Sequence, residues 1–445
     1  MRIMVVYTNR YKMLCPAPIG ALLVAHRLRQ AGHQVTFVDL MHEKEPAKRL
    51  TAALAETSPE LVCFSIRNVD NQMMAELDRP LDEIVPLAAL VKQHTKAPLL
   101  LGGTAVTTFP VQIRALLGAD YAYAGDDVEP IVQFVNSLRH GAPDLTVPGL
   151  VYEDAGGVHR NPYTIRGYHG TKWGGHEWVS LKAYRKGYYD CGVVTHSGCP
   201  HGCSFCDAHR SFGRDYVLRE VRQVVAEIAE LKSRHKARSL WLVNSGINRP
   251  LDYGKELMAR LIEAKLGLFF GCIIEPGEFD AELARLMYRA GCSAPMLFGS
   301  TLADSVLERN QPHYRSADVV SAARLLHEAK MGCMLGLMFG APGETLDTVQ
   351  HTLDLAREIK PIMTITGVGF RVQSETPLRQ IAVDQGVIAA DDDCFQARFY
   401  VSPDSPVEGI RERIAAHRRA DRGAQWRMAK FVLGSVRESI FGRKV

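Results

Sequence analysis

The chain has 445 residues, of which 47% are hydrophobic and 23% are charged, and its formal net charge is +4. This length and composition predict two or three domains with full cores and exclude a disordered or fibrous protein. The balance of 53 basic and 49 acidic residues is too even to indicate nucleic acid as a partner, and we expect none. The sequence has no apolar stretch of the ~20 residues that cross a bilayer, and residues 1–7 lack the features of a signal peptide. We therefore expect a cytoplasmic protein without a membrane span, whose ten cysteines stay reduced.

Residues 1–140 alternate short apolar runs with segments of helical length, which predicts a doubly wound, Rossmann-like parallel sheet. The expected strands are Ile3–Thr8, Val35–Leu40, Leu61–Ile66, Pro98–Gly102 and Tyr121–Ala124. The expected helices are Gly20–Ala31, Ala47–Thr57, Leu81–His94, Val111–Leu117 and Glu129–Arg139. Ligands bind such sheets at the carboxyl ends of the strands. The residues at these ends are Thr8, Arg67, Gly102, Gly103, Thr104 and Gly125. The glycines either let a ligand approach the backbone or only make tight turns.

Residues 141–187 are rich in glycine and proline and are expected to form a linker with a small hairpin at Gly149–Glu153 and Val158–Asn161. A second alternation occupies residues 188–375. Its expected strands are Val193–His196, Ser239–Asn244, Phe269–Ile274, Ala294–Phe298, Gly332–Phe339 and Thr364–Arg371. Six strand–helix units predict a partial (β/α)6 barrel with its chemistry at the carboxyl ends of the strands. Residues 376–445 are expected to be a C-terminal helical region, whose excess of arginine and lysine is typical of a solvated helix face.

Three cysteines follow the first strand of this second domain in a C-x3-C-x2-C pattern: Cys199, Cys203 and Cys206. Thiolates at this spacing can converge on one soft metal centre, either zinc or an iron–sulfur cluster. A structural zinc site needs a fourth protein ligand, for which the nearby candidates are His196, His201 and His209. No second cysteine pair follows, and the loop is expected at the mouth of the barrel, so both features favour a catalytic centre over structural zinc.

The motif C-x3-C-x-aromatic-C after the first strand of a βα barrel, with Phe205 in the aromatic position, resembles that of the radical S-adenosylmethionine (radical SAM) superfamily. The resemblance implies that the three cysteines hold a 4Fe–4S cluster, whose fourth iron is chelated by S-adenosylmethionine (SAM). It also implies an electron donor of the flavodoxin or ferredoxin type. Reduction of such a cluster splits SAM into methionine and a 5′-deoxyadenosyl radical.

Later segments stand at the strands where this family contacts SAM. The segments that match in position are Asn244-Ser245-Gly246, Gly299-Ser300-Thr301, and the stretch from Gly336 to Gly340, which precedes the turn Pro342-Gly343-Glu344-Thr345. A turn and a helix cap explain that last turn equally well. We expect the adenine near Phe205 or the strand that contains Phe339, because apolar walls suit a flat ring. Tyr216, Glu275 and Asp207 are candidate general acids at the barrel mouth, among which the sequence does not choose.

The first domain resembles the cobalamin-binding domain of one radical SAM subfamily. The resemblance rests on Gly102-Gly103-Thr104 and on Gly125-Asp126-Asp127-Val128-Glu129-Pro130. The Asp-x-His-x-x-Gly motif of methionine-synthase-type domains is absent, so no histidine is placed to coordinate cobalt. If Arg67 faces the corrin it leaves the lower side of the cobalt without a protein ligand, because a guanidinium stays protonated. Arg67 could equally clamp an anion or form a salt bridge.

Together these resemblances predict an enzyme with a 4Fe–4S cluster, SAM and cobalamin. The favoured function is cobalamin-dependent methyl transfer to an unactivated carbon of a small-molecule or peptide substrate. A first alternative is a radical SAM dehydratase, cyclase or epimerase of natural-product biosynthesis that transfers no methyl group. A second is a zinc-stabilised binding protein. The corrin is expected between the two domains, with its nucleotide tail threaded into the N-terminal sheet.

Overall fold

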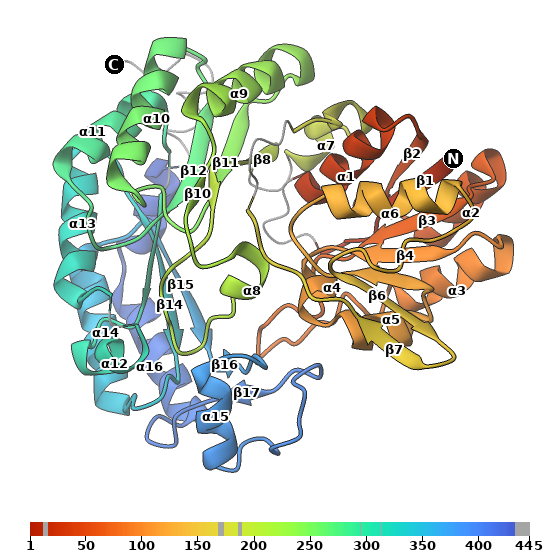
Figure 1. The fold of residues 1–445 in the computed structure, drawn as a ribbon. Helices are drawn as coiled ribbons and strands as arrows, with labels where there is room; N and C mark the ends of the chain where they lie inside the picture. The colour runs from red at the N-terminus through yellow and green to blue at the C-terminus, as the bar shows by residue number, and fades with distance from the viewer. Residues whose placement is uncertain (12–16, 168–172, 186–188, 294, 312, 432–445) are drawn as a thin grey trace.

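The computed structural model describes residues 1–11, 17–167, 173–185, 189–293, 295–311 and 313–431. Two parallel-rich sheets form two halves that lie side by side, the N-terminal half in red to yellow and the second half in green to blue (Figure 1). Among the described residues, no helix is both long and apolar enough to cross a membrane. The predicted α/β architecture with a doubly wound sheet followed by a partial barrel is confirmed.

The N-terminal sheet has the strand order β2-β1-β3-β4-β5-β6-β7. Its five parallel strands are β1 (Arg2–Tyr7), β2 (Gln34–Asp39), β3 (Leu61–Ser65), β4 (Leu99–Gly102) and β5 (Tyr121–Tyr123). Its helices are α1 (Ile19–Gln30), α2 (Pro46–Thr57), α3 (Val85–His94), α4 (Thr104–Thr108), α5 (Pro110–Leu117) and α6 (Glu129–Arg139). Side chains alternate along β1, so Val5 packs toward α1 and α6 while Val6 packs toward α2, α3 and α5. Both faces of the sheet are therefore covered, as its apolar strands predict.

The hairpin expected within the linker is present as β6 (Leu150–Asp154) and β7 (Gly157–Arg160). It does not lie apart from the first domain, because β6 pairs antiparallel with β5 and extends the N-terminal sheet. The apolar side chains of Leu150 and Val151 bury against that sheet, which explains why the segment joins it. The short helices η1 (His176–Trp178) and α7 (Leu181–Tyr184) then lead toward the barrel.

The barrel sheet is wholly parallel, in the order β15-β14-β13-β12-β11-β8. Its strands are β8 (Cys191–Val194), β11 (Ser239–Val243), β12 (Phe269–Ile274), β13 (Met296–Ser300), β14 (Met334–Phe339) and β15 (Met363–Val368). The helices on its outer side are α9 (Val221–His235), α10 (Leu251–Ala264), α11 (Ala281–Ala290), α12 (Asp304–Asn310), α13 (Ser316–Glu328) and α14 (Leu346–Ile359) (Figure 1). The first strand ends earlier than predicted, because His196–Ser197 leaves the sheet as β9 and pairs with β10 (Val217–Leu218).

The C-terminal part is less helical than predicted. The hairpin β16 (Phe370–Arg371) and β17 (Phe399–Tyr400) encloses α15 (Pro377–Asp384), and α16 (Val407–Ala420) follows. The basic residues of this region are partly engaged, since Arg418 donates to the Thr366 hydroxyl at 2.9 Å and Arg427 pairs with Asp421 at 2.5 Å. The end of the predicted basic segment, residues 432–445, lies outside the described residues.

Candidate functional site

The cysteine loop runs from the end of β9 toward α8 (His209–Phe212), which lies between the two halves in Figure 1. Backbone bonds fix both of its ends, because the Cys199 amide donates to the Gly213 carbonyl at 3.1 Å and the Ser204 amide to the Asn310 carbonyl at 2.9 Å. The Ser204 hydroxyl also donates to the Asn310 side-chain oxygen at 2.7 Å. The loop is thus held to α12 on the far side of the barrel mouth.

The thiols of Cys199, Cys203 and Cys206 are unpaired and lie close together. Burial, and then the neighbouring Cys206 thiol, raises the pKa of Cys203 to about 12. The Gln311 amide donates to the Cys203 sulfur at 3.8 Å. Thiols become thiolates when a soft metal displaces their protons, so three neighbouring sulfurs could ligate one metal centre.

The other cysteines in the described part of the chain are buried in the two halves and touch no such cluster: Cys63, Cys191, Cys272, Cys292, Cys333 and Cys394. They behave as small apolar side chains. Cys15 of the first βα loop lies outside the described residues.

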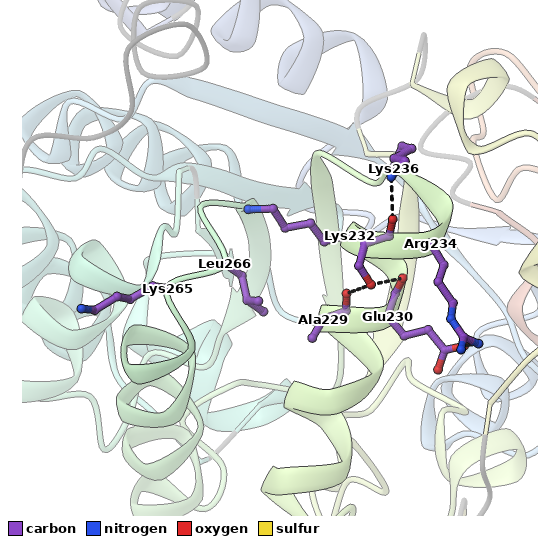
Figure 2. A pocket seen from close by; sticks show the side chains of 8 residues that line it. Ala229, Glu230, Lys232, Arg234, Lys236, Lys265 and Leu266 are labelled. Atoms are coloured by element: carbon purple, nitrogen blue, oxygen red, sulfur yellow. Dashed lines mark hydrogen bonds and ion pairs between the residues drawn. The ribbon is translucent and has the colours of Figure 1, made fainter.

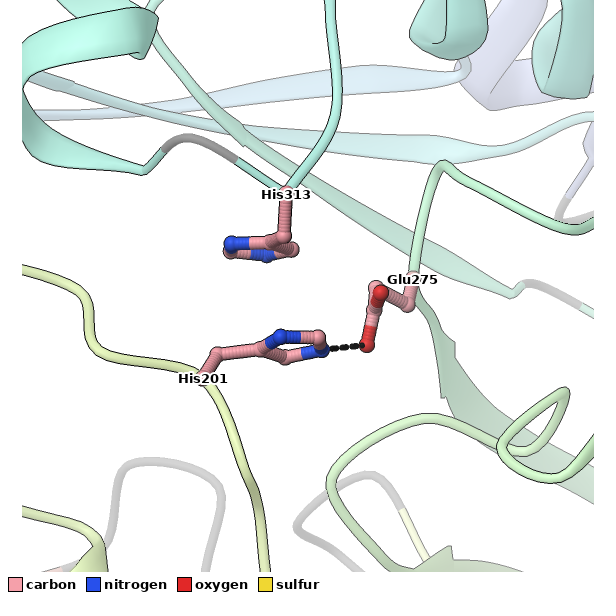
Figure 3. Close-up of side chains that lie close together, drawn as sticks. All are labelled: His201, Glu275 and His313. Atoms are coloured by element: carbon pink, nitrogen blue, oxygen red, sulfur yellow. Dashed lines mark hydrogen bonds and ion pairs between the residues drawn. The ribbon is translucent and has the colours of Figure 1, made fainter.

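Beside the cysteine loop, Glu275 at the end of β12 organises a polar network (Figure 3). His201 bonds the Glu275 carboxylate at 2.7 Å and stacks on His313 with ring centroids 3.8 Å apart. Arg249 pairs with the other carboxylate oxygen at 2.5 Å. The Asn248 side chain accepts from the Glu275 amide at 3.0 Å and donates to its carbonyl at 2.9 Å, which fixes the backbone.

This network determines the protonation of Glu275. Burial alone would raise the pKa of the carboxyl, but the hydrogen bond from His201 and the charge of Arg249 outweigh burial and lower it. Glu275 is therefore ionised at neutral pH, a state that suits a proton acceptor better than the predicted general acid. The ligand atoms of His201, Glu275 and His313 lie within 4.8 Å of one another, but the Arg249 pair already balances the carboxylate. Sequence analysis missed this pairing, because the four residues come from separate loops.

The other two candidate acids are protonated more readily. Burial raises the pKa of Tyr216, whose ring lies edge-on to His196 with centroids 5.7 Å apart. The Tyr216 hydroxyl is buried and has no hydrogen-bond partner among the described residues. Burial likewise raises the pKa of Asp207, next to Cys206. Burial thus favours the protonated form of both side chains, which is the form that can donate a proton.

The segment after β11 binds the start of the cysteine loop. The Ser245 hydroxyl donates to the Gly198 carbonyl at 2.9 Å, and the Asn244 amide donates to the Thr195 hydroxyl at 3.1 Å. A Cβ on Gly246 would approach the Glu275 Cβ to 3.1 Å, so this segment also touches the network. The first of the three predicted SAM segments therefore adjoins both the start of the cysteine loop and Glu275.

The segments after β13 and within β14 lie at the same mouth. Gly299 and Ser300 end β13, Ser300 at a positive φ of 45°, but the Thr301 hydroxyl points toward α14 and bonds Thr352 there at 3.0 Å. The Gly340 amide donates to the Glu344 carboxylate, and burial raises the pKa of that carboxyl to about 7. Gly336 leaves room for the Phe298 ring, which a Cβ would approach to 3.1 Å.

The two phenylalanines expected near the adenine differ in accessibility. Phe205 is half-buried and packs on Phe370 with ring centroids 4.6 Å apart. Phe339 is completely buried in the core of the barrel half, so it cannot stack on a ligand. Alternation along β14 turns the Phe339 side chain away from the barrel interior, so a contact of the adenine with this strand would involve its other residues, and the position of the adenine stays a prediction.

A cavity of about 750 Å³ opens at the carboxyl ends of the N-terminal strands. Of the residues predicted there, Arg67, Gly102, Gly103, Thr104 and Gly125 line it. Thr8 is not among the lining residues, since it is buried and its hydroxyl donates to the Ser65 carbonyl at 2.9 Å. Gly103 is required by the backbone, because its φ is +103° and a Cβ would lie 2.4 Å from the Ile66 carbonyl oxygen.

The same cavity extends in two directions. Along the sheet it forms a slot between β1, β3 and β4 on one side and α1 and α6 on the other, lined by Val5, Cys63, Leu100, Ala21 and Ile131. Across the domain boundary it reaches the inner side of the barrel strands, where Trp241 and Phe298 line it. A flat, partly apolar group with a long substituent fits this shape, and both halves would contact it.

A second, shallow hollow lies at the carboxyl ends of α9 and α10, away from the strand ends that carry the thiols (Figure 2). Half of its lining residues are basic: Lys232, Arg234, Lys236 and Lys265. Lys236 donates to the Ser233 carbonyl at 2.7 Å and Arg234 pairs with Glu230 at 3.0 Å. These cations complement the helix ends, so the hollow needs no ligand to explain it.

Comparison with known proteins agrees with the division of the chain into an N-terminal sheet domain and a barrel domain. Residues 193–356 match the model of the radical SAM superfamily, and residues 12–135 match that of the B12 binding domain. The chain is 23% identical over 424 residues to the tryptophan 2-C-methyltransferase of Streptomyces laurentii, an alignment that covers 80% of this chain and 70% of that protein. It is 25% identical over 357 residues to the anaerobic magnesium-protoporphyrin IX monomethyl ester cyclase of Cereibacter sphaeroides, with 77% of this chain and 57% of that protein covered.

The fold resembles the solved structure of the radical SAM methyltransferase TsrM from Kitasatospora setae with cobalamin and a 4Fe–4S cluster bound. The TM-score is 0.81 at 21% identity, with 94% of this chain and 90% of that chain covered. A radical SAM domain works with a 4Fe–4S cluster and SAM, and a B12-binding domain works with cobalamin, so these are the cofactors of the chain. The match to the radical SAM model also argues against the alternative that the chain is a zinc-stabilised binding protein. The chain is an enzyme of the radical SAM superfamily that carries a B12-binding domain ahead of its radical SAM domain.

Proposed function

We propose that this enzyme methylates a carbon atom of a small molecule, with SAM as the methyl source and cobalamin as the carrier. One observation carries the proposal: a single cavity is lined both by the strand ends of the B12-binding domain and by the inner side of the barrel strands. A methyl carrier and a substrate in this cavity would be in contact, which makes the transfer effectively unimolecular. The likeness to a tryptophan 2-C-methyltransferase over 80% of the chain supports the same reaction class.

In this proposal Cys199, Cys203 and Cys206 hold the cluster and leave one iron for SAM. The absence of disulfides among them, the electrostatic coupling of Cys203 to the other two thiols and the anchoring of the loop to Asn310 support that assignment. The segments Asn244–Gly246, Gly299–Ser300 and Gly336–Gly340 lie at the same barrel mouth and would contact SAM with Phe205. Thr301 would act only through packing, since its hydroxyl is bound to Thr352.

The B12-binding domain would hold the corrin against Gly102, Gly103, Thr104 and Gly125, with the nucleotide tail in the slot between the sheet and α1 and α6. The slot is apolar on both sides, which suits the flat base of such a tail. Arg67 lines the cavity at the end of β3. As a permanent cation it would face the corrin without ligating cobalt.

The overall reaction balances as follows: substrate R–H, two SAM and two electrons give R–CH3, S-adenosylhomocysteine, 5′-deoxyadenosine and methionine. The bound cofactors supply the radical and carry the methyl group. An electron donor of the flavodoxin or ferredoxin type would supply the electrons. Tyr216 and Asp207 are the residues of this chain that could donate a proton, and the ionised Glu275 is the one that could accept a proton.

The second candidate is a radical reaction without methyl transfer, such as cyclisation. The 25% identity to an anaerobic magnesium-protoporphyrin IX monomethyl ester cyclase over 357 residues favours it, although this chain spans 57% of that protein. The two candidates share every cofactor-holding residue above. They differ in whether the methyl group of SAM is transferred to the substrate or stays on methionine.

Product analysis separates them. The protein would be produced with hydroxocobalamin in the medium, purified without oxygen, and supplied with methyl-labelled SAM, a reductant and a panel of candidate substrates. Methyl transfer predicts corrinoid in the purified protein and label in the substrate, together with S-adenosylhomocysteine. Formation of 5′-deoxyadenosine with no labelled product would support the second candidate. An intact cluster and SAM cleavage without any bound corrinoid would overturn the methyltransferase proposal.

A further inference from the structure

The barrel side of the cavity differs in chemistry from the side formed by the B12-binding domain. We call this side the barrel chamber and define it by inward-facing residues of five strands: Trp241, Ile273, Phe298, Met334, Met363 and Ile365. These side chains point inward because residues two apart on a strand share a face. The barrel chamber lies opposite the strand ends proposed to hold the corrin, so it is the space left for a substrate.

The barrel chamber exposes apolar surface inside the protein. Phe298 is 44% exposed and Ile365 is 39% exposed, although both lie in the middle of parallel strands. Side chains at such positions are normally covered, and uncovered apolar area costs about 25 cal/mol per Å². The apolar surface therefore fits an occupant that is itself apolar.

No residue of the barrel strands that lines the cavity carries a charge. Among the described residues, the charged ones in its lining belong to the B12-binding domain: Arg67, Asp126 and Asp127. Asp126 accepts the backbone amides of Arg166 and Gly167, at 3.1 and 2.6 Å, and Asp127 accepts the Glu129 amide at 3.0 Å. An ionised group placed in the barrel chamber would lose its water without gaining a partner there, which is strongly unfavourable.

The composition of the barrel chamber also distinguishes a flat ring from a saturated skeleton. Trp241 forms a tilted pair with Tyr189, with ring centroids 5.3 Å apart, and Phe298 adds a third ring. Met334 and Met363, which start β14 and β15, line the same cavity as these rings. Thioethers and ring edges both make favourable contacts with aromatic faces, beyond the area that they bury.

We infer that the substrate presents an uncharged aromatic ring system, which enters the barrel chamber and carries the carbon that is modified. This inference rests on the proposed function and specifies its substrate class. Any polar or ionic part of the substrate would lie outside the barrel chamber, toward the barrel mouth.

The test measures binding to the anaerobically purified protein with its cluster and corrinoid in place. The probes are three compounds on one carbon skeleton: 2-naphthol, decahydro-2-naphthol and 2-naphthoate. Calorimetric titration should detect 2-naphthol, with the saturated alcohol bound roughly tenfold more weakly because it forms no ring contacts. The carboxylate should bind roughly a hundredfold more weakly, because it brings an unpaired charge. Equal binding of the saturated alcohol, or tighter binding of 2-naphthoate, would overturn the inference.

A matched pair of variants locates the binding site. Phe298→Glu places a charge in the barrel chamber and should abolish 2-naphthol binding, whereas Leu116→Glu, at an equally exposed apolar position on α5, should not. Retained 2-naphthol binding in Phe298→Glu would overturn the inference. If Phe298→Glu loses iron or corrinoid, Ile365→Glu is tested in its place. The comparison of the three probes uses the unmodified protein and therefore does not depend on any variant.

The binding data and the cofactor data separate this inference from the proposed function. Protein that contains cluster and corrinoid but fails to bind 2-naphthol would overturn the substrate class alone. Protein that binds 2-naphthol selectively but takes up no corrinoid would overturn the proposed methyl transfer alone.

Discussion

Arg371 and Asp70 form a buried ion pair between the two halves of the molecule, with the guanidinium Nε 2.8 Å from the carboxylate. The side chains are 4% and 1% exposed. Arg371 also donates to the Val372 carbonyl at 2.9 Å and the Cys394 carbonyl at 3.1 Å, and Asp70 accepts the Gln72 amide at 2.9 Å. Asp70 lies three residues beyond Arg67, so the pair attaches the Arg67 loop to the barrel half.

Loss of one partner of this pair should destabilise the protein more than loss of both. Asp70→Leu leaves Arg371 buried and unpaired, which should lower the free energy of unfolding by about 3 kcal/mol. The double variant Asp70→Leu with Arg371→Met should recover a large part of that loss. Denaturant unfolding of the unmodified protein, the two single variants and the double variant gives the coupling energy between Asp70 and Arg371. If the effects of the two single substitutions simply add in the double variant, the prediction is wrong.

Replacement of Cys199, Cys203 and Cys206 by alanine should remove the iron absorbance and all cleavage of SAM. The thiols are proposed as the only protein ligands of the cluster, so no other group would retain it. Cys333→Ala, at a buried cysteine of the barrel half, is the matched control and should keep its iron. Iron and sulfide analysis decides the matter; a full cluster in the triple variant would disprove the assignment.

Gly103→Ala should impair both folding and corrinoid binding. The residue has a φ of +103°, and a Cβ would lie 2.4 Å from the Ile66 carbonyl oxygen, so the cost should be about 1–3 kcal/mol. Gly102→Ala is the control, because nothing lies within 4 Å of its Cβ position. Thermal unfolding should show a lower midpoint for Gly103→Ala only. Equal midpoints would contradict the strain argument.

Arg67→His should change the spectrum of the bound corrinoid. An arginine leaves the lower side of the cobalt without a protein nitrogen, whereas a neutral imidazole can coordinate it. Electron paramagnetic resonance of the reduced corrinoid should show splitting from one nitrogen in the variant and none in the unmodified protein. The same splitting in both proteins would remove Arg67 from the corrin face.

The stability of the enzyme should depend on pH through Glu344. Burial raises the pKa of this carboxyl from 4.5 to about 7 in the folded protein, so between these values the folded state binds more protons than the unfolded state. Its contribution is therefore favourable below pH 4.5 and is lost as the pH rises to 7. Glu344→Gln should match the unmodified protein at pH 4 and exceed its unfolding free energy by about 3 kcal/mol at pH 8. If the unfolding free energies of Glu344→Gln and the unmodified protein differ by the same amount at every pH, the prediction is wrong.

The local signals of the sequence determined most of the architecture. Apolar runs and helical periodicity depend on neighbouring residues, so the strands of both sheets and helices such as Glu129–Arg139 could be predicted close to their observed bounds. The spacing of Cys199, Cys203 and Cys206 is also local, and it is sufficient to predict a shared metal centre.

The tertiary structure alone decided which of these local features act together. Asp70 and Arg371 are 301 residues apart, and Glu275 meets His201 and Arg249 from three separate loops. Side-chain pairing over such separations follows from the packing of whole elements, which periodicity does not encode. The same packing turned the Phe339 ring into the core, bound the Thr301 hydroxyl to Thr352, and joined the N-terminal strand ends and the barrel interior in one cavity.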